Sequence, residues 1–349
     1  MLGRPAMALA AALTLLVCGA APAAADVVLP EEPAPQERVA ATVNPALVRV
    51  TGTFGGWVRS PGGASGSGWP YTVVFTCSAF GVHPDGYLAT AGHCIDANDP
   101  GVLATFIRGA AERYARERPD MPVERIVDWG RSAWVVEGRD AGSPVESEIR
   151  VTGIAGSPPD GVFARVVDDR PIGQGDVGLL KVDTTDLPTL ELATGAGVAV
   201  GTPVLAAGYP ESAGDGIRPG TTPQVEAGTV VETSTEGGRP LSRMDVPPDV
   251  GMSGGATLDA DGRVVGINTY RTSGSQLISV VIPVGTFTDL LGRNGVQAQP
   301  GPRDLRYREA VDAYFSGEYT DAIVAIDGLE RDGTIHPRLD QLRSDAQAA

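Results

Sequence analysis

Histidine and lysine are both scarce in this sequence of 349 residues. The histidines are His83, His93 and His336, and Lys181 is the single lysine. A three-histidine metal site would need all of these histidines, and the chain has neither a His-Glu-x-x-His run nor a Cys-x-x-Cys pair. We therefore expect no metal site.

Positive charge is also in short supply. The 27 lysines and arginines face 43 aspartates and glutamates, which gives a formal net charge of −16 with no basic block. Such a field repels phosphate backbones and anionic lipids, so we expect no nucleic-acid partner. Outside the N-terminus no apolar run reaches the roughly 18 residues of a membrane-spanning helix. We expect no transmembrane span in the mature chain.

The N-terminus has the pattern of a short secretory signal peptide. Residues 1–25 begin with a positive charge at Arg4, continue through an apolar stretch and end in a small-residue cleavage motif at Ala25. We predict cleavage near Ala25 and a secreted or extracytoplasmic location. The apolar core is too short for a membrane anchor. Lipid attachment at Cys18 is the weaker alternative, because bulky Val17 stands where a small residue is usual.

Two cysteines remain after this cleavage, Cys77 and Cys94. An even pair in an exported protein predicts a disulfide. The chain-entropy estimate for such a loop is a stabilisation of roughly 3 kcal/mol. The alternative is a pair of free buried thiols, which export disfavours.

The composition and strand pattern predict a mainly β protein. The chain holds 46 glycines and 28 prolines, and from Leu47 onward these residues separate short β-prone runs. Many short strands without helices between them favour an antiparallel barrel or sandwich. Residues 26–39 are acidic and proline-rich, so we predict a disordered lead-in before a domain over residues 40–298.

Residues 99–170 interrupt this strand pattern and are predicted to be a helix-containing insertion. Between Val102 and Ala115, apolar residues recur at helical spacing, which predicts an amphipathic helix over residues 101–117. We interpret its apolar face as core packing and not as a membrane-surface helix.

The C-terminal residues 303–349 are predicted to form a helical hairpin. Small and aromatic residues occur at spacings similar to those of one tetratricopeptide repeat, namely Ala310, Gly317, Tyr319, Ala322 and Leu329. A single repeat cannot bury its apolar face alone. This helical tail is therefore expected to pack on the rest of the chain, on another copy or on a protein partner. A generic amphipathic tail is the open alternative.

Three short motifs lie far apart in the sequence. The first is the run Thr-Ala-Gly-His-Cys that ends at Cys94, and the second is Gly175 and Asp176 before an apolar strand. The third is the Gly-Met-Ser-Gly-Gly run of residues 251–255. Each motif alone has an ordinary explanation, as a core histidine, a turn residue or a flexible loop.

Together the three motifs carry the groups of nucleophilic catalysis. A serine hydroxyl becomes a nucleophile when a neutral imidazole takes its proton, and an acid must fix the tautomer of that imidazole. We predict Ser253 as the nucleophile, His93 as the general base and Asp176 as the orienting acid. A developing oxyanion needs backbone N–H donors in a tight turn, and we assign Gly251 and Ser253 to this task.

The Gly-Met-Ser-Gly-Gly run also fits the nucleophile elbow of α/β-hydrolases. In that fold the catalytic histidine follows the serine. Only His336 follows Ser253 here, within the predicted helical tail, and no βαβ pattern surrounds the serine. An esterase of the α/β-hydrolase class is therefore the weaker hypothesis.

The three motifs, in the order histidine, aspartate, serine, resemble those of chymotrypsin-like serine proteases. Within that superfamily the chain is most similar to bacterial HtrA-type proteases, over residues 40–293 apart from 99–170. The resemblance implies two antiparallel β-barrels with the active site between them and a small helical C-terminal unit. It also implies a disulfide between Cys77 and Cys94.

The function implied by this resemblance is a secreted serine endopeptidase. Such an enzyme hydrolyses polypeptides through an acyl-enzyme intermediate and needs no metal or organic cofactor. The competing hypothesis is a catalytically degenerate relative that binds peptides or acts as a scaffold. The complete set of triad motifs argues against degeneracy.

The resemblance also assigns supporting residues, with some departures. Thr269 stands where the family has a hydroxyl that supports the aspartate, and Tyr270 and Arg271 would border the substrate channel. Met252 replaces the usual Asn or Asp before the serine and would form part of the substrate wall. Ala256 replaces a proline, and no PDZ domain is recognisable.

The expected substrate pocket lacks a buried charge. Pro247 stands six residues before the serine, so the pocket floor offers no carboxylate for a basic side chain. An apolar wall at Met252 predicts a preference for aliphatic substrate residues. Arg271 is the residue that could instead pair with an acidic substrate side chain.

Overall fold

The computed structural model describes residues 35–59, 70–195, 197–211, 222–247, 249–273, 276–333 and 337–349. The predicted signal peptide and the candidate lipid site at Cys18 lie outside these residues. Within them, no helix is long and apolar enough to cross a membrane.

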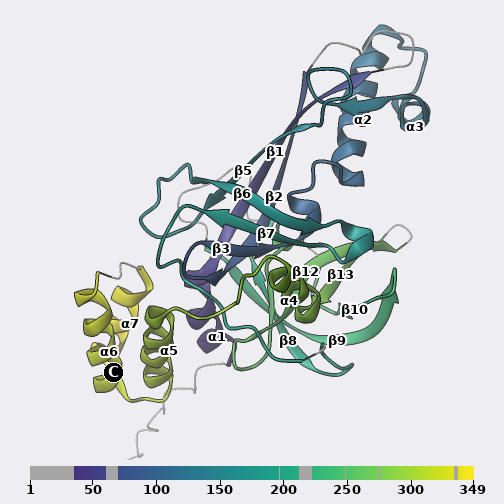
Figure 1. Cartoon of the computed structure of the whole chain (residues 1–349). Coiled ribbons are helices and arrows are strands. Elements are labelled where there is room, and N and C mark those ends of the chain that lie inside the picture. Colours follow the sequence, from purple (N-terminus) through teal and green to yellow (C-terminus); the bar gives the residue numbers. More distant parts are fainter. Residues whose placement is uncertain are drawn as a thin grey trace, which may run out of the picture. The chain divides into compact units, whose positions relative to one another are not determined.

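The first β-barrel is antiparallel and is built mainly from the N-terminal half of the chain (Figure 1). Its strands follow the order β2-β3-β7-β6-β5-β1, and the pairing of β1 with β2 closes it. The apolar side chains that point inward, among them Phe54, Leu88, Val151 and Leu180, share one core. The strands are β1 (Leu47–Arg59), β2 (Pro70–His83), β3 (Tyr87–Thr90), β5 (Glu146–Thr152), β6 (Val162–Arg170) and β7 (Val177–Val182).

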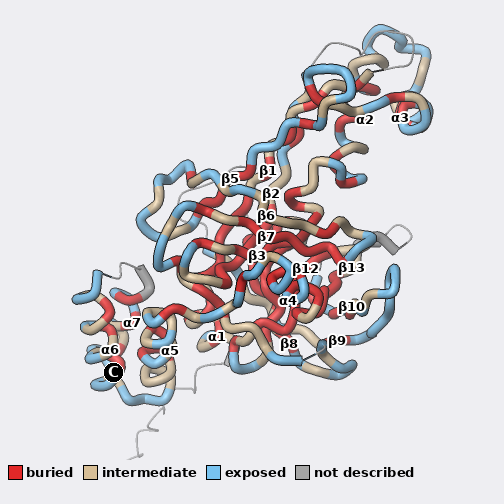
Figure 2. The backbone as a smooth tube through the Cα atoms, in the orientation of Figure 1, coloured by how far each residue is buried: buried red, intermediate tan, exposed pale blue. Residues whose placement is uncertain are grey.

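The second barrel is also closed and antiparallel, with the strand order β10-β13-β12-β11-β8-β9. Figure 2 shows that buried residues follow the strands of both barrels. The two barrels confirm the predicted fold class. The strands are β8 (Pro203–Gly208), β9 (Gln224–Glu236), β10 (Arg239–Met244), β11 (Ala256–Leu258), β12 (Val264–Ser273) and β13 (Gln276–Pro283), and helix α4 (Val284–Arg293) follows them.

The insertion contains two helices, α2 (Pro100–Glu117) and α3 (Val123–Ala133), and the short strand β4 (Val135–Glu137). Helix α2 confirms the predicted helix to within one residue. Asp99 caps its N-terminus, with Oδ1 accepting the Gly101 N–H at 2.7 Å. The apolar face of α2 packs onto the long strands β1 and β2, as predicted for a core helix.

The predicted insertion over residues 99–170 was too long. Its last part forms β5 and β6, which are strands of the first barrel. Several residues of β5 and β6 are exposed or half-buried. The two strands can therefore carry charged side chains, and they lack the apolar pattern of the other strands. For this reason the composition of residues 146–170 did not predict that they are strands of the first barrel.

The predicted disordered lead-in also ended too late, because helix α1 (Pro35–Val43) includes residues 35–39. Helix α1 has apolar contacts on two sides. Val39 and Val43 belong to the core that includes the second barrel, whereas Ala41 belongs to the core of the C-terminal helices. These contacts stabilise helix α1, although its charged and proline-containing sequence resembles that of a disordered segment.

The C-terminal tail forms helices α5 (Pro302–Phe315), α6 (Tyr319–Arg331) and α7 (Pro337–Ala348), one more than the predicted hairpin. It packs on its own chain. The Tyr307 hydroxyl donates to the Ala41 carbonyl at 2.8 Å, and the Asp304 carboxylate accepts the Thr189 N–H at 3.1 Å. The burial that accompanies these contacts raises the pKa of Asp304.

Candidate active site

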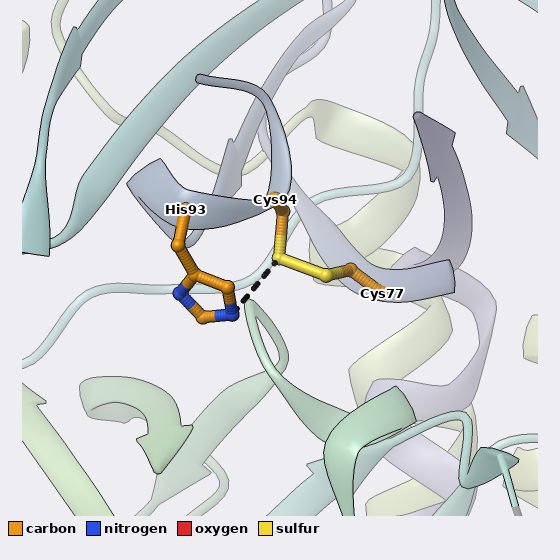
Figure 3. Close-up of side chains that lie close together, drawn as sticks. All are labelled: Cys77, His93 and Cys94. Atoms are coloured by element: carbon orange, nitrogen blue, oxygen red, sulfur yellow. Dashed lines mark hydrogen bonds between the residues drawn. A yellow bond between two sulfur atoms is a disulfide. The ribbon is translucent and has the colours of Figure 1, made fainter. Parts of the chain in front are cut away.

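His93 lies on a short 3₁₀ turn, Gly92–Cys94, directly after β3. The predicted disulfide is present and joins Cys94 to Cys77 on β2 with an S–S distance of 2.06 Å. Figure 3 shows the imidazole beside this disulfide, with Nε2 at 3.7 Å from the Cys94 sulfur. Because both sulfurs are bonded to each other, this trio of residues offers no thiolate to a metal ion.

We expect removal of this disulfide to lower the free energy of unfolding by roughly 3 kcal/mol, because the unfolded chain regains the conformational entropy that the closed loop restricts. The test is chemical denaturation of the Cys77→Ala/Cys94→Ala double variant beside the unchanged protein. Mass spectrometry of the exported protein should show one intramolecular disulfide. Equal unfolding midpoints, or two free thiols in the exported protein, would contradict this prediction.

Asp176 enters the site from a strained turn before β7. Its own φ is +52°, and the preceding Gly175 has φ +123°. A Cβ on Gly175 would lie 2.8 Å from the Thr286 methyl carbon. Both the positive φ and this close contact therefore require glycine at position 175. The turn places the Asp176 carboxylate in full burial beside His93.

The Asp176 carboxylate is held by three hydrogen bonds from the two predicted partners. Oδ1 accepts from the backbone N–H of His93 at 3.0 Å and lies 3.0 Å from its Nδ1. Oδ2 accepts the Thr269 hydroxyl at 2.7 Å. The structure therefore brings together three of the predicted site residues in the arrangement that an orienting acid requires.

The two ionisable groups shift each other in opposite directions. Burial acts to raise the pKa of Asp176, but the charge and hydrogen bonds of His93, with Thr269 and Arg271, hold it well below its usual range. Burial acts to lower the pKa of His93, but the carboxylate of Asp176 outweighs it and the net pKa is raised. The neutral form of His93 is therefore lost as the pH falls through this raised value.

Ser253 directly follows a 3₁₀ turn over Val250–Met252 and is 2% exposed. Its carbonyl accepts the N–H of Ser78, a residue of β2, at 2.7 Å, so the serine loop of the second barrel is bound to the first. The next residue, Gly254, has φ +82°, and a Cβ there would lie 2.3 Å from the Ser78 carbonyl oxygen. Only glycine allows this close approach.

The predicted nucleophile, Ser253, and His93 both lie against the disulfide, and no hydrogen bond joins the serine hydroxyl to the imidazole. The Cys94 sulfur lies 3.9 Å from the Ser253 carbonyl oxygen and 3.7 Å from the His93 Nε2. Within the described residues the buried Ser253 hydroxyl has no hydrogen-bond partner.

The two backbone N–H groups predicted for the oxyanion hole are occupied. The Gly251 N–H donates to the Asp249 carboxylate at 3.0 Å, and the Ser253 N–H donates to the Val250 carbonyl at 3.2 Å. Asp249 also accepts the Glu211 N–H at 2.7 Å. Sequence reasoning missed Asp249, although an aspartate two residues before a glycine is a common turn signal.

A small cavity of about 10 Å³ adjoins Ser253, and its lining combines apolar side chains with polar ones that include the carboxylate of Asp249. That volume holds about one water molecule. Met252 and Tyr270, both predicted to touch substrate, contribute to its lining, as do Met244, Val246 and Pro247. Met252 is only 5% exposed, so its side chain fills the space beside the serine.

Arg271 does not lie free at the rim of this cavity. Its Nη1 lies 3.2 Å from the Asp176 Oδ2 and 3.3 Å from the Thr269 hydroxyl, and its Nε lies 3.2 Å from a carboxylate oxygen of Glu236. An acidic substrate side chain, the predicted partner of Arg271, would compete with the carboxylates of Asp176 and Glu236 for its guanidinium. Sequence reasoning could not find Glu236, since it precedes Arg271 by 35 residues.

Known proteins match parts of this chain. A probable periplasmic serine endoprotease, DegP-like, from Pseudomonas fulva is 34% identical over 120 residues, which are 34% of this chain and 24% of that relative. A protein with the same description from Hahella chejuensis is 29% identical over 145 residues, 38% of this chain and 30% of the relative. The chain thus spans about a quarter to a third of the length of these curated relatives.

Solved structures are similar at lower identity. A structure described as the HtrA-type protease AlgW with decapeptide has 20% identity and a TM-score of 0.45, covering 74% of this chain and 67% of the other. The serine endoprotease from Yersinia pestis has 19% identity and a TM-score of 0.43, covering 74% and 66%. The model of the trypsin-like peptidase domain family matches residues 77–267. Because this match covers more than half of the chain, the chain belongs to the trypsin-like peptidase domain family.

Proposed function

We propose that this protein is a serine endopeptidase that cleaves polypeptides outside the cytoplasm. The observation that carries the proposal is the buried Asp176 carboxylate, hydrogen-bonded to the Nδ1 of His93 and to Thr269. An Nδ1–H bonded to a carboxylate leaves Nε2 with its lone pair, which is the atom that must take the serine proton. The curated relatives named as periplasmic serine endoproteases support the same function and location.

The proposed reaction uses Ser253, His93 and Asp176 in turn. Ser253 Oγ attacks the substrate carbonyl while its proton passes to His93 Nε2, and the resulting imidazolium is stabilised by Asp176. His93 then donates this proton to the departing amine as the C–N bond breaks, which leaves an acyl-enzyme. A water molecule attacks the ester, again losing a proton to His93, and the acid product leaves with Ser253 restored.

Oxyanion stabilisation requires a change in the serine loop. The N–H groups of Gly251 and Ser253 must leave Asp249 and the Val250 carbonyl before they can donate to a substrate oxygen. We propose that a bound substrate opens this 3₁₀ turn. The energy needed for two exchanged hydrogen bonds is modest, because each broken bond is replaced by one to the oxyanion.

A peptide-binding protein without catalysis is the second candidate. The occupied N–H groups and the unbonded Ser253 hydroxyl favour it, since catalysis requires N–H groups that can donate to the oxyanion and a serine hydroxyl that can pass its proton to the imidazole. Labelling with a fluorophosphonate probe separates the two candidates, because only an activated serine reacts. We expect labelling of the full chain at Ser253 and none in Ser253→Ala. A full chain that stays unlabelled at neutral pH would support the binding protein.

A further inference from the structure

Arg271 joins the predicted triad to the hairpin of β9 and β10. It lies on β12, two residues after Thr269, and its side chain is 15% exposed. The guanidinium lies between the carboxylates of Asp176 and Glu236, and it also donates to the Tyr270 carbonyl at 2.9 Å. Glu236 is the last residue of β9, so the hairpin supplies one of the two carboxylates.

We propose that Arg271 is a positioning residue of the triad, which fixes the Asp176 carboxylate against His93 and offsets part of its negative charge. This inference rests on the proposed function, in which His93 is the general base. The fork of an arginine suits the task, because it can donate to two carboxylates at once from a fixed plane. Glu236 holds the far side of the guanidinium and so sets its orientation.

The charges around His93 explain why such an offset is useful. Asp176 contacts the imidazole directly, and Asp99, the capping residue of α2, acts on it as a second negative charge. Tyr270 packs its ring edge-on at 5.5 Å between ring centroids. In the described part of the chain, the charges that act on the imidazole are those of Asp176, Asp99 and Arg271, and of these Arg271 is positive. Without it, two carboxylates would hold His93 protonated to a higher pH, and less free base would remain.

The direct measurement is an NMR titration of the histidines in the Ser253→Ala variant, which needs no catalytic activity. The chain has only 3 histidines, so a His93→Ala spectrum assigns the signal. We expect Arg271→Gln to raise the pKa of His93 by about 0.5 to 1 unit. Arg271→Lys loses the fork but keeps the positive charge to which the titration responds, so it should leave the pKa of His93 within about 0.2 unit. Asp99→Asn should shift it downward, because it removes a negative charge and keeps a good helix cap.

Arg243→Gln is the matched control. Arg243 lies on β10 in the same hairpin and pairs with Glu232, and the change removes the same charge. We expect it to leave the His93 titration unchanged. An unchanged His93 pKa in Arg271→Gln would overturn the proposal, as would an equal shift in Arg271→Lys or in Arg243→Gln.

Kinetics then distinguish positioning from substrate recognition. A positioning role predicts that Arg271→Gln lowers kcat about 3- to 10-fold on neutral and acidic peptides alike, with the acid limb of the pH profile moved upward. Contact with an acidic substrate residue predicts a rise in KM confined to acidic peptides, and this result would overturn the proposal. Absence of any peptidase activity in the unchanged protein would defeat the proposed function instead, while the NMR titration would still report on Arg271.

Discussion

Peptide hydrolysis is expected to fall at least about 10⁴-fold in Ser253→Ala and in His93→Ala, because each change removes a member of a unit that acts together. The Ser253 hydroxyl makes no hydrogen bond within the described structure, so its loss should leave the fold intact. The measurement is kcat/KM on an internally quenched peptide with purified protein, with the thermal unfolding midpoint of each variant beside it.

His83→Ala is the matched control for the histidine. His83 is at the end of β2, accepts the Asp85 N–H at 3.1 Å and faces Gln299, with no contact to the triad. We expect this variant to keep full activity. Turnover near that of the unchanged protein in either Ser253→Ala or His93→Ala, or an equal loss in His83→Ala, would refute the assignment of the triad.

Cleavage is expected to be at least about 100-fold more efficient after small aliphatic residues than after lysine or arginine. The cavity beside Ser253 is small and its apolar lining includes Met244, Val246 and Met252. A cationic side chain there would lose its water, and the carboxylate in the lining, Asp249, already accepts the N–H of Glu211. A fluorogenic panel that varies only the residue before the scissile bond measures this preference.

Met252→Ala should widen the accepted range. Removing the thioether enlarges a cavity of about 10 Å³, so kcat/KM for leucine or phenylalanine should rise about 10-fold relative to alanine. Met121→Ala, in the loop between α2 and α3, is the control and should leave the ratio unchanged. Efficient cleavage after lysine or arginine would contradict the apolar pocket, and an unchanged ratio in Met252→Ala would remove Met252 from its wall.

Local patterns in the sequence predicted a mainly β fold and the candidate site, and the resemblance carried by the three motifs implied the two barrels. Glycine and proline punctuation marked the strands, and apolar spacing placed the helix over 101–117. The three motifs around His93, Asp176 and Ser253 include the backbone requirements of their turns, such as glycine at position 254. Requirements of this kind are local, so they can be read from neighbouring residues.

Strand and helix assignments failed where burial comes from distant segments. The charged strands β5 and β6 are stabilised by pairing with β1 and β7, and α1 by cores formed far along the chain. None of these partners is visible within the segment itself. Propensity and composition describe a segment alone, whereas pairing and apolar contact depend on what lies beside it.

The sequence alone therefore predicted which residues would carry out the chemistry and determined the order in which they occur, since the candidate catalytic groups stand in short motifs. Only the tertiary structure decided how those groups are held. The contacts of Arg271 with Asp176 and Glu236, and of Asp249 with the N–H of Gly251, depend on the paths of separate loops and strands. Hydrogen bonds and charges act over a few ångströms in space, and sequence separation does not report that distance.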